Sequence, residues 1–374
     1  MGARRALDDR EPPERGATTC REPAEGSPPR VPRRLSEGAA GDHQKEVTMS
    51  RKILLGALAA AAVSAGAAQA QTLDDVKARG YLQCGVSTGV AGFAFTDENG
   101  EWQGFDVSVC RAVAAAIFGD PMAVQFTPTT GKTRFTALAS GEVDMLARNT
   151  TWTFSRDVDL KFEFVGVNYY DGQGFMVPRE LGVTSAMELD GATVCIQTGT
   201  TTELNLADFF RVNGMSYEPV PIETNAEAQQ RYLAGACDVY TTDASGLAAT
   251  RSTFEDPGAH VILPEIISKE PLGPLVRHGD HEWGDIVRWT LNALIIAEEK
   301  GVTAANVMEL ASAPTDSPEI NRMLGTAGEY GPMIGLEQDW VVNVISSVGN
   351  YGEIFAEYIG TDTEIGLERG LNAL

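Results

Sequence analysis

Residues 141–157 read GEVDMLARNTTWTFSRD and predict a buried strand that opens into a polar loop and ends on an arginine. The loop offers hydroxyl and amide side chains but no catalytic nucleophile or base. Its Arg156 carries a planar guanidinium, which can bind a carboxylate through two parallel hydrogen bonds. A polar turn with an ordinary surface ion pair would show the same pattern, so the stretch alone leaves both interpretations open.

A second copy of this pattern lies later in the chain. Residues 138–144 (LASGEVD) and 233–238 (LAGACD) both indicate a helix end, a glycine stop and an aspartate before a strand. Five residues after each aspartate comes a polar residue at the expected strand end, Asn149 and Asp243 respectively. Ligands of open α/β sheets bind at the carboxyl ends of strands. The duplication therefore predicts two lobes that face each other across a cleft.

The remaining chain alternates between strand and helix patterns, which predicts an α/β fold. The expected strands are residues 81–86, 124–126, 143–147, 162–167, 193–196, 237–241 and 261–267. The expected helices are residues 106–118, 135–139, 203–212, 226–234, 283–300 and 337–348.

Residues 49–70 have the composition of a secretory signal peptide. A basic start, Met-Ser-Arg-Lys, precedes an apolar run over residues 53–68 and an Ala-Gln-Ala cleavage site that ends at Ala70. The run is too short to span a membrane. We expect an exported mature chain that starts near Gln71. Residues 1–48 are expected to be an upstream translation artefact, with a disordered extension as the alternative.

The charge of the chain excludes some partners. The net charge is −23, and it becomes −25 when the eleven basic and nine acidic residues of 1–70 are removed. Such a surface repels nucleic acid and anionic membranes. No Gly-x-Ser-x-Gly, Walker, HExxH or CxxC motif occurs, and no histidine falls in the polar loops. We therefore expect no metal, no cofactor and no enzymatic activity.

Cysteine usage predicts two disulfides. Beyond Cys20, which precedes the signal peptide, the chain has Cys84, Cys110, Cys195 and Cys237. An even number in an oxidising compartment favours pairing. Three pairings are possible, and position favours 84 with 110 and 195 with 237. Four buried thiols are the alternative.

Two further segments could complement Arg156. Residues 197–201 (QTGTT) predict a strand-to-helix turn, where free N–H groups bind anions; helix capping by Thr201 or Thr202 is the alternative interpretation. Asp243 could hold an ammonium group, or could cap the next helix. A carboxylate-binding group and an ammonium-binding group together fit an α-amino acid.

Residues near the end of the first strand are weaker candidates. Phe93 and Phe95 could form walls of the site, although two core aromatic residues would show the same pattern. Ser87 stands at the strand end and could also face the ligand.

Four segments resemble one family, the family 3 extracellular solute-binding proteins. They are GFDVSVCRAVAAA (104–116), RNTTWT (148–153), QTGTTTE (197–203) and VGNYGE (348–353). Within the family the chain is similar to general L-amino-acid-binding components of polar amino acid ATP-binding-cassette (ABC) importers. The similarity runs from about Leu73 to the C-terminus.

The resemblance implies a type II periplasmic binding protein. Its two α/β lobes would be joined by hinge crossings near residues 170–174 and 267–271. Lobe 1 would comprise residues 71–170 and 271–374, including a C-terminal helical extension, and lobe 2 residues 171–270. The implied function is periplasmic binding of L-amino acids, as a monomer, and delivery to the permease subunits in the inner membrane.

The resemblance also implies roles for single residues. Arg156 matches the arginine that binds the α-carboxylate, Asn149 and Thr151 match contact positions, Thr201 matches a carboxylate donor, and Asp243 matches the acid that binds the ammonium.

The resemblance also concerns the pocket for the ligand side chain. Gln197 matches a position that faces the ligand side chain, whereas two other positions depart from the family. Residues 130–132 lack the aromatic residue that often stacks on the ligand, and Ser87 replaces an acid found in some relatives. Both changes suggest a roomy pocket with broad specificity.

An enzyme on the same scaffold is the alternative function. Some periplasmic cyclohexadienyl and arogenate dehydratases resemble solute-binding proteins. Such chemistry requires a general acid in the cleft, for which Asp243 is the candidate.

Overall fold

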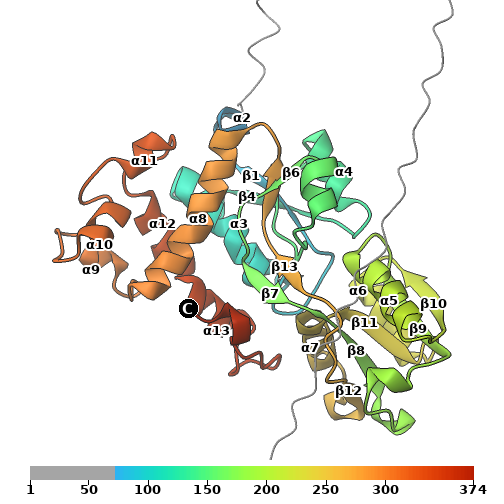
Figure 1. Ribbon diagram of the computed structural model, residues 1–374. Helices are drawn as coiled ribbons and strands as arrows, with labels where there is room; N and C mark the ends of the chain where they lie inside the picture. The colour runs from blue at the N-terminus through green and yellow to red at the C-terminus, as the bar shows by residue number, and fades with distance from the viewer. Residues whose placement is uncertain (1–71) are drawn as a thin grey trace, which may run out of the picture. The chain divides into compact units, whose positions relative to one another are not determined.

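The structure is a computed structural model that describes residues 72–374, so the predicted signal peptide and residues 1–48 lie outside the described residues. Within the described range, strands and helices alternate (Figure 1), which confirms the predicted α/β class. No helix in this range is long and apolar enough to cross a membrane.

The first five-stranded sheet has the strand order β4-β1-β5-β14-β6. Its strands are β1 (Leu82–Val86), β4 (Val124–Pro128), β5 (Met145–Leu146), β6 (Phe162–Phe164) and β14 (Leu275–Arg277). Strand β1 runs parallel to β4 and β5, whereas β14 runs antiparallel to β5 and β6. The helices that pack on this sheet are α2 (Thr72–Arg79), α3 (Phe105–Phe118), α4 (Arg134–Ser140) and α8 (His281–Glu299).

The second sheet, of order β10-β9-β11-β8-β12, repeats this arrangement. Its strands are β8 (Gln173–Pro178), β9 (Ala192–Gln197), β10 (Tyr217–Ile222), β11 (Val239–Asp243) and β12 (His260–Ile262). Strand β9 runs parallel to β10 and β11, and β8 runs antiparallel to β11 and β12. Its helices are α5 (Thr201–Val212), α6 (Asn225–Leu233) and α7 (Ala244–Ser252).

Two short strands lie at the crossings between these sheets. Strand β7 (Tyr169–Asp171) leads into β8 and pairs antiparallel with β13 (Glu270–Leu272), which leads towards β14. The register places Glu270 opposite Asp171. A separate hairpin is formed by β2 (Phe95–Thr96) and β3 (Trp102–Gln103).

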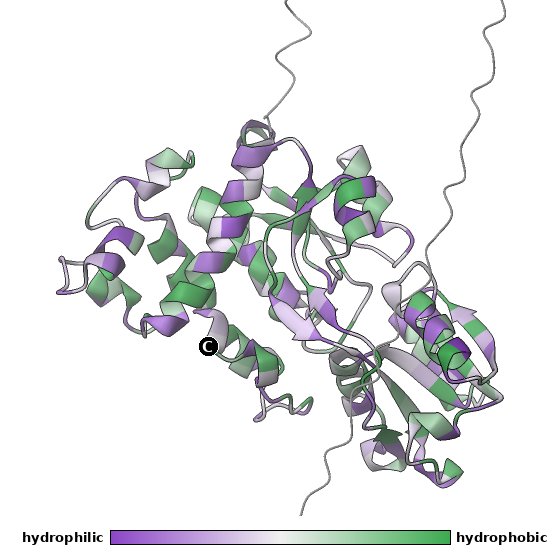
Figure 2. Cartoon of the chain, viewed as in Figure 1, coloured by the Kyte–Doolittle hydropathy of each residue, from purple (hydrophilic) through white to green (hydrophobic). Residues whose placement is uncertain are grey.

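The C-terminal segment is helical and packs on the first sheet's helices. It contains α9 (Val307–Leu310), α10 (Pro318–Met323), α11 (Tyr330–Met333), α12 (Trp340–Val348) and α13 (Tyr351–Tyr358). Helix α12 contacts α3 and α8. Figure 2 shows that α8 carries both hydrophilic and hydrophobic residues, as expected for a helix with one buried face. Its buried face includes Ile286, Val287, Leu291 and Leu294.

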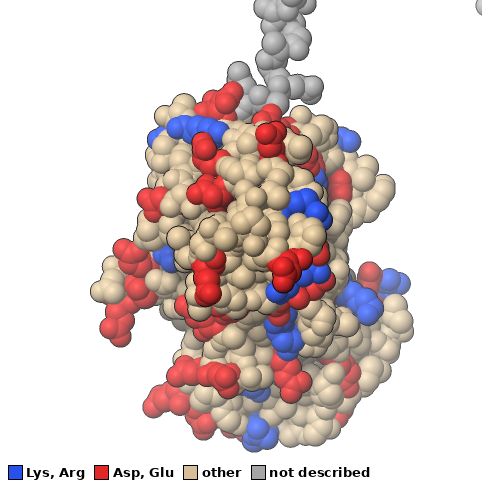
Figure 3. Space-filling view, turned by 90° about the vertical axis from the view of Figure 1, so that its left-hand side faces the viewer, with Lys and Arg blue, Asp and Glu red and all other residues tan. Residues whose placement is uncertain are grey.

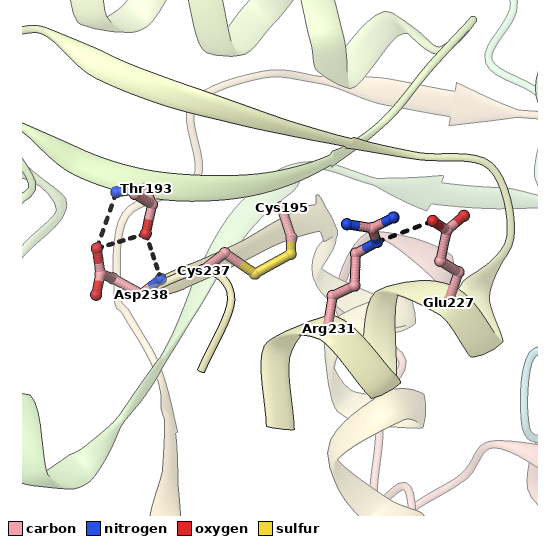
Figure 4. Close-up of a disulfide and its surroundings, with 6 residues drawn as sticks. All are labelled: Thr193, Cys195, Glu227, Arg231, Cys237 and Asp238. Carbon is pink, nitrogen blue, oxygen red and sulfur yellow. Dashed lines mark hydrogen bonds and ion pairs between the residues drawn. A yellow bond between two sulfur atoms is a disulfide. The ribbon is translucent and has the colours of Figure 1, made fainter. Parts of the chain in front are cut away.

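The two repeated aspartates have the same structural role. Oδ2 of Asp144 accepts a hydrogen bond from the backbone N–H of Gln83 in β1, at 2.8 Å. Oδ2 of Asp238 accepts one from the backbone N–H of Thr193 in β9, at 2.9 Å (Figure 4). Each aspartate therefore joins the start of its own strand, β5 or β11, to the neighbouring parallel strand, β1 or β9.

Two disulfides lie within residues 72–374, and they are the pairs that position favoured. Cys84 in β1 bonds to Cys110 in α3, and Cys195 in β9 bonds to Cys237 just before β11 (Figure 4). Each bridge closes a loop within one sheet region. Acidic side chains are spread over the face drawn in Figure 3, with basic ones among them, in keeping with the negative net charge.

Candidate functional site

A small cavity lies at the carboxyl ends of β5, β9 and β11. Five of the predicted site residues line it: Asn149, Thr151, Gln197, Thr201 and Asp243. The cavity encloses about 20 Å³, which is room for one water molecule. An amino acid therefore needs the walls to part.

The loop after β5 forms the first wall. Asn149 has a φ of 40°, a left-handed conformation that asparagine adopts more readily than most residues, and its Oδ1 is buried without a hydrogen-bond partner in the described part of the chain. Arg156 is buried in a one-turn π-helix, Ser155–Asp159. Its Nη1 donates to the carbonyl oxygen of Thr151 at 2.9 Å, which fixes the guanidinium beside the cavity.

Two further buried arginines lie beside Arg156, and the sequence had assigned neither of them a role. Arg134 and Arg148 both line the cavity. Burial lowers the pKa of Arg148 to about 10, although the nearby Asp106 carboxylate opposes this change. Burial and the neighbouring guanidinium groups hold the pKa of Arg134 well below its usual value. The first wall is therefore strongly cationic. Arg134 lies on α4, apart from the quoted motif, so no local pattern pointed to it.

The start of α5 contributes the second wall. Thr200, rather than Thr201 or Thr202, caps the helix, because its side chain accepts a hydrogen bond from the N–H of Glu203 at 3.3 Å. The capping interpretation for Thr201 and Thr202 is therefore wrong, and their N–H groups lie in the first turn, where a helix presents donors to anions. Gln197 also lines the cavity, while its Nε2 donates to the carbonyl of Glu223 at 2.7 Å.

Asp243 is the most unusual group of the site. Its side chain is 6 % exposed and stands at the N-cap position of α7 without making a capping hydrogen bond. Within residues 72–374, the structure records no hydrogen bond or ion pair to its carboxylate. Burial, and then the negative charges of Asp171 and Glu270, raise the pKa of Asp243 well above its usual value. A buried carboxylate without a partner is costly, and a ligand cation would compensate it.

Glu270 is a further acid that sequence patterns did not reveal. It is 2 % exposed, and its carboxylate accepts hydrogen bonds from the hydroxyls of Thr151 and Thr201, at 2.6 and 2.8 Å. The residue lies in β13, more than a hundred positions after Thr151 in the chain. Glu270 reaches the site because β13 lies at the second crossing of the chain between the two sheets.

Three of the eight predicted site residues do not line the cavity: Arg156, which lies beside it and is bonded to Thr151, and Phe93 and Ser87. Phe93 is 3 % exposed and packs edge-to-face against Phe105 and Tyr169, in the core beside the first sheet. Ser87 is buried, and its hydroxyl has no hydrogen-bond partner among the described residues.

A larger hollow, of about 500 Å³, lies beside α3 and α13. Two of its charged side chains take part in the fold: Arg111 donates through Nη2 to the carbonyl of Trp102, and Glu353 completes the capping box of α13. We therefore place the candidate site in the smaller cavity, where buried charges of both signs converge.

The sequence model of the bacterial extracellular solute-binding proteins, family 3, matches residues 82–300. The chain therefore belongs to this family. It is 63% identical over 325 residues to the glutamate/glutamine/aspartate/asparagine-binding protein BztA of Rhodobacter capsulatus, covering 87% of this chain and 96% of that protein. It is 58% identical over 330 residues to the general L-amino acid-binding periplasmic protein AapJ of Rhizobium johnstonii, with the same coverage.

Solved structures agree with this assignment. An ABC transporter periplasmic binding protein from Brucella ovis with glutathione bound has a TM-score of 0.79 and 57% identity, covering 81% of this chain and 95% of that one. An ancestral amino acid-binding protein described as a precursor of cyclohexadienyl dehydratase has a TM-score of 0.53 and 28% identity, covering 62% and 96%. The relatives at 58–63% identity are named as binding proteins.

Proposed function

We propose that the protein binds L-amino acids of broad, mainly polar kinds in the periplasm and delivers them to the inner-membrane permease of an ABC importer. The names of the relatives at 58–63% identity support this proposal. The observation that carries it is the buried carboxylate of Asp243, which has no hydrogen bond or ion pair within residues 72–374, in a cavity that is also lined by the buried Arg134 and Arg148. A third buried arginine, Arg156, is bonded to the lining residue Thr151. A zwitterion satisfies both sides of such a site.

In this proposal the ligand carboxylate lies against Arg156 and the backbone N–H groups of Thr151 and Thr201, and the ligand ammonium lies against Asp243. An arginine fork and free helix N–H groups are well suited to a carboxylate. Residues 71–170 with 271–374, and residues 171–270, act as two lobes that part to admit the ligand. The paired strands β7 and β13 are the hinge.

Isothermal titration calorimetry tests the proposal directly. Protein that has been unfolded, stripped of ligand and refolded is titrated with each of the twenty L-amino acids, and thermal-shift measurements are made in parallel. We expect saturable binding of several polar amino acids. The proposal fails if no amino acid produces either heat or a shift of the melting temperature.

We further propose that the exported, monomeric protein is not an enzyme. The alternative is a dehydratase with Asp243 as its general acid, since a raised pKa suits that role. Names of the closer relatives support binding, whereas the dehydratase precursor is a more distant structure. Incubation with prephenate or arogenate should give no product. Sequencing of the exported protein's N-terminus should locate cleavage near Ala70.

A further inference from the structure

The turn that carries Arg156 is too short to keep its shape by itself. Residues Ser155–Asp159 form a single π-helical turn, in which the N–H of Leu160 donates to the carbonyl oxygen of Ser155 at 2.9 Å. Isolated helices of this length are unstable in water, and the π-form is rare. The position of Arg156 must therefore be fixed by contacts with the rest of the protein.

Trp152 lies four positions before Arg156 and supplies such contacts, although it does not line the cavity. Its indole ring stacks on Phe164 of β6, with the ring centroids 5.6 Å apart and the planes inclined by 7°. Its backbone N–H donates to the carbonyl oxygen of Pro271 in β13 at 2.8 Å. Its Nε1–H donates to Oδ2 of Asp157 at 2.7 Å. The tryptophan thus connects two strands to the residue that directly follows Arg156.

The carboxylate of Asp157 receives contacts on both oxygens. Besides the indole N–H on Oδ2, Nε2 of His278 lies 3.3 Å from Oδ1. A hydrogen bond to an ionised carboxylate is stronger than one between neutral groups. The bond between Trp152 and Asp157 therefore closes the loop that contains Arg156 and limits how far the backbone of Arg156 can move.

These contacts do not depend on the distance between the two walls of the cavity. Phe164 lies in β6 of the first sheet, His278 follows β14 of the same sheet, and Pro271 lies in the crossing strand β13. None of the three belongs to the second sheet or to its helices. Trp152 is also 40 % exposed, so it contributes less to the core than a buried tryptophan would.

We propose that Trp152 is a positioning residue that holds the Arg156 guanidinium where it meets the carboxylate of an amino-acid ligand. This inference rests on the proposed function. The hydrogen bond from Arg156 Nη1 to the carbonyl of Thr151 fixes the end of the side chain, and the bond from Trp152 to Asp157 fixes its backbone. A group that is held in place before binding costs less to order when the ligand arrives. Since every α-amino acid has the same carboxylate, Trp152 should strengthen the binding of all ligands by a common factor.

The test compares Trp152→Phe with a matched control, Trp289→Phe. The first change removes the indole N–H and keeps an aromatic ring beside Phe164. Trp289 lies on α8, is 48 % exposed and does not line the cavity. The control therefore makes the same chemical change at a similarly exposed position away from the site.

Two measurements are made on ligand-stripped protein: calorimetric affinity for L-glutamine, L-glutamate and L-alanine, and hydrogen–deuterium exchange of the amides of residues 153–160. We expect Trp152→Phe to weaken all probes that bind the wild type by a common factor of about five, and to speed exchange in this segment. Trp289→Phe should change neither quantity. Unequal losses among the probes, unchanged affinity or unchanged exchange would overturn the proposal.

A double-variant comparison separates positioning of Arg156 from a general effect on stability. If Trp152 acts through Arg156, Trp152→Phe should reduce affinity by less than about twofold in protein that already carries Arg156→Lys. The same fivefold loss in both backgrounds would contradict the role. Asp157→Ala gives a second comparison in case Arg156→Lys binds no probe. Its combination with Trp152→Phe should bind no more weakly than Asp157→Ala alone, and additive losses would contradict the inference.

The two proposals can fail separately. If the wild type binds none of the probes, the proposed function fails, whereas the exchange comparison still decides whether Trp152 holds the turn. If Trp152→Phe does not fold, Asp157→Ala removes the acceptor and leaves the tryptophan in place. This variant should then show the common loss of affinity and the faster exchange, and the absence of either would overturn the inference.

Discussion

The segments that follow β5 and β11 carry side chains of opposite charge at the cavity, and the protein provides different partners for the two charges. After β5, Arg156 is held by the carbonyl of Thr151, and Arg148 lies near the compensating charge of Asp106. After β11, the carboxylate of Asp243 has no hydrogen bond or ion pair within the described residues, and burial raises its pKa although the charges of Arg134 and Arg156 oppose this change. On the cationic side Arg156 is thus fixed by the protein, although Nε of Arg134 and of Arg148 has no hydrogen-bond partner among the described residues. On the anionic side the carboxylate of Asp243 has neither a hydrogen bond nor an ion pair within residues 72–374. We therefore expect substitutions on the two sides of the cavity to differ in their effect on the stability of the ligand-free protein.

The largest expected effect is that of Arg156→Ala on affinity. Because Arg156 is a buried, charged and bidentate hydrogen-bond donor, its removal should weaken the binding of every amino acid by roughly 2–5 kcal/mol. This corresponds to a loss of affinity of about thirtyfold or more. Calorimetry measures the loss. Arg211→Ala is the control, because Arg211 lies exposed on α5 and pairs with Asp208. Wild-type affinity in Arg156→Ala would show that the carboxylate assignment is wrong.

Asp243→Asn should have the next largest effect, and should act in opposite directions on binding and on stability. Affinity should fall by about 2 kcal/mol, because asparagine still accepts one hydrogen bond but lacks the charge. The unfolding free energy of the stripped protein at pH 7 should rise, since a costly buried charge is removed. Chemical denaturation measures the second quantity, with Asp208→Asn on the exposed face of α5 as the control. A variant that is both weaker in binding and less stable would contradict the unpaired state of Asp243.

The pH dependence of stability offers a smaller effect of the same origin. Because the pKa of Asp243 is raised by folding, the folded state binds more protons than the unfolded state above the usual pKa of about 3.8. Wild-type stability should therefore fall, relative to Asp243→Asn, as the pH rises from about 4 through the raised pKa. Denaturation curves of both stripped proteins, measured across this range, should diverge with rising pH. Parallel curves would mean that Asp243 is compensated without a ligand.

The smallest effect on affinity is expected for Phe93→Leu. This ring packs against Phe105 and Tyr169 in the core, so the change should cost about 1–2 kcal/mol of stability and leave affinity within about twofold. Thermal unfolding and calorimetry on the same preparation measure both quantities. A tenfold loss of affinity would instead place Phe93 in contact with the ligand.

Much of the fold could be predicted because its signals are local. The glycine stops, the alternation of strand and helix patterns and the repeated aspartates at 144 and 238 lie within short windows, and the structure uses them in both sheets. The polar strand ends at Asn149 and Asp243 were recognisable for the same reason. Helix capping was harder to assign, because any of several adjacent threonines could cap α5. Thr200 is the N-cap because its backbone is extended and its side chain accepts a hydrogen bond from the N–H of Glu203.

The sequence by itself determined the α/β class, the two cysteine pairs favoured by position, and the residues at both strand ends. The tertiary structure alone decided that Arg134 and Glu270 join the site, because they arrive from α4 and from the second crossing. It also decided that the Asp243 carboxylate is buried without a hydrogen bond or ion pair from residues 72–374. Burial and hydrogen bonding depend on which distant segments meet, and no local pattern of residues carries that information.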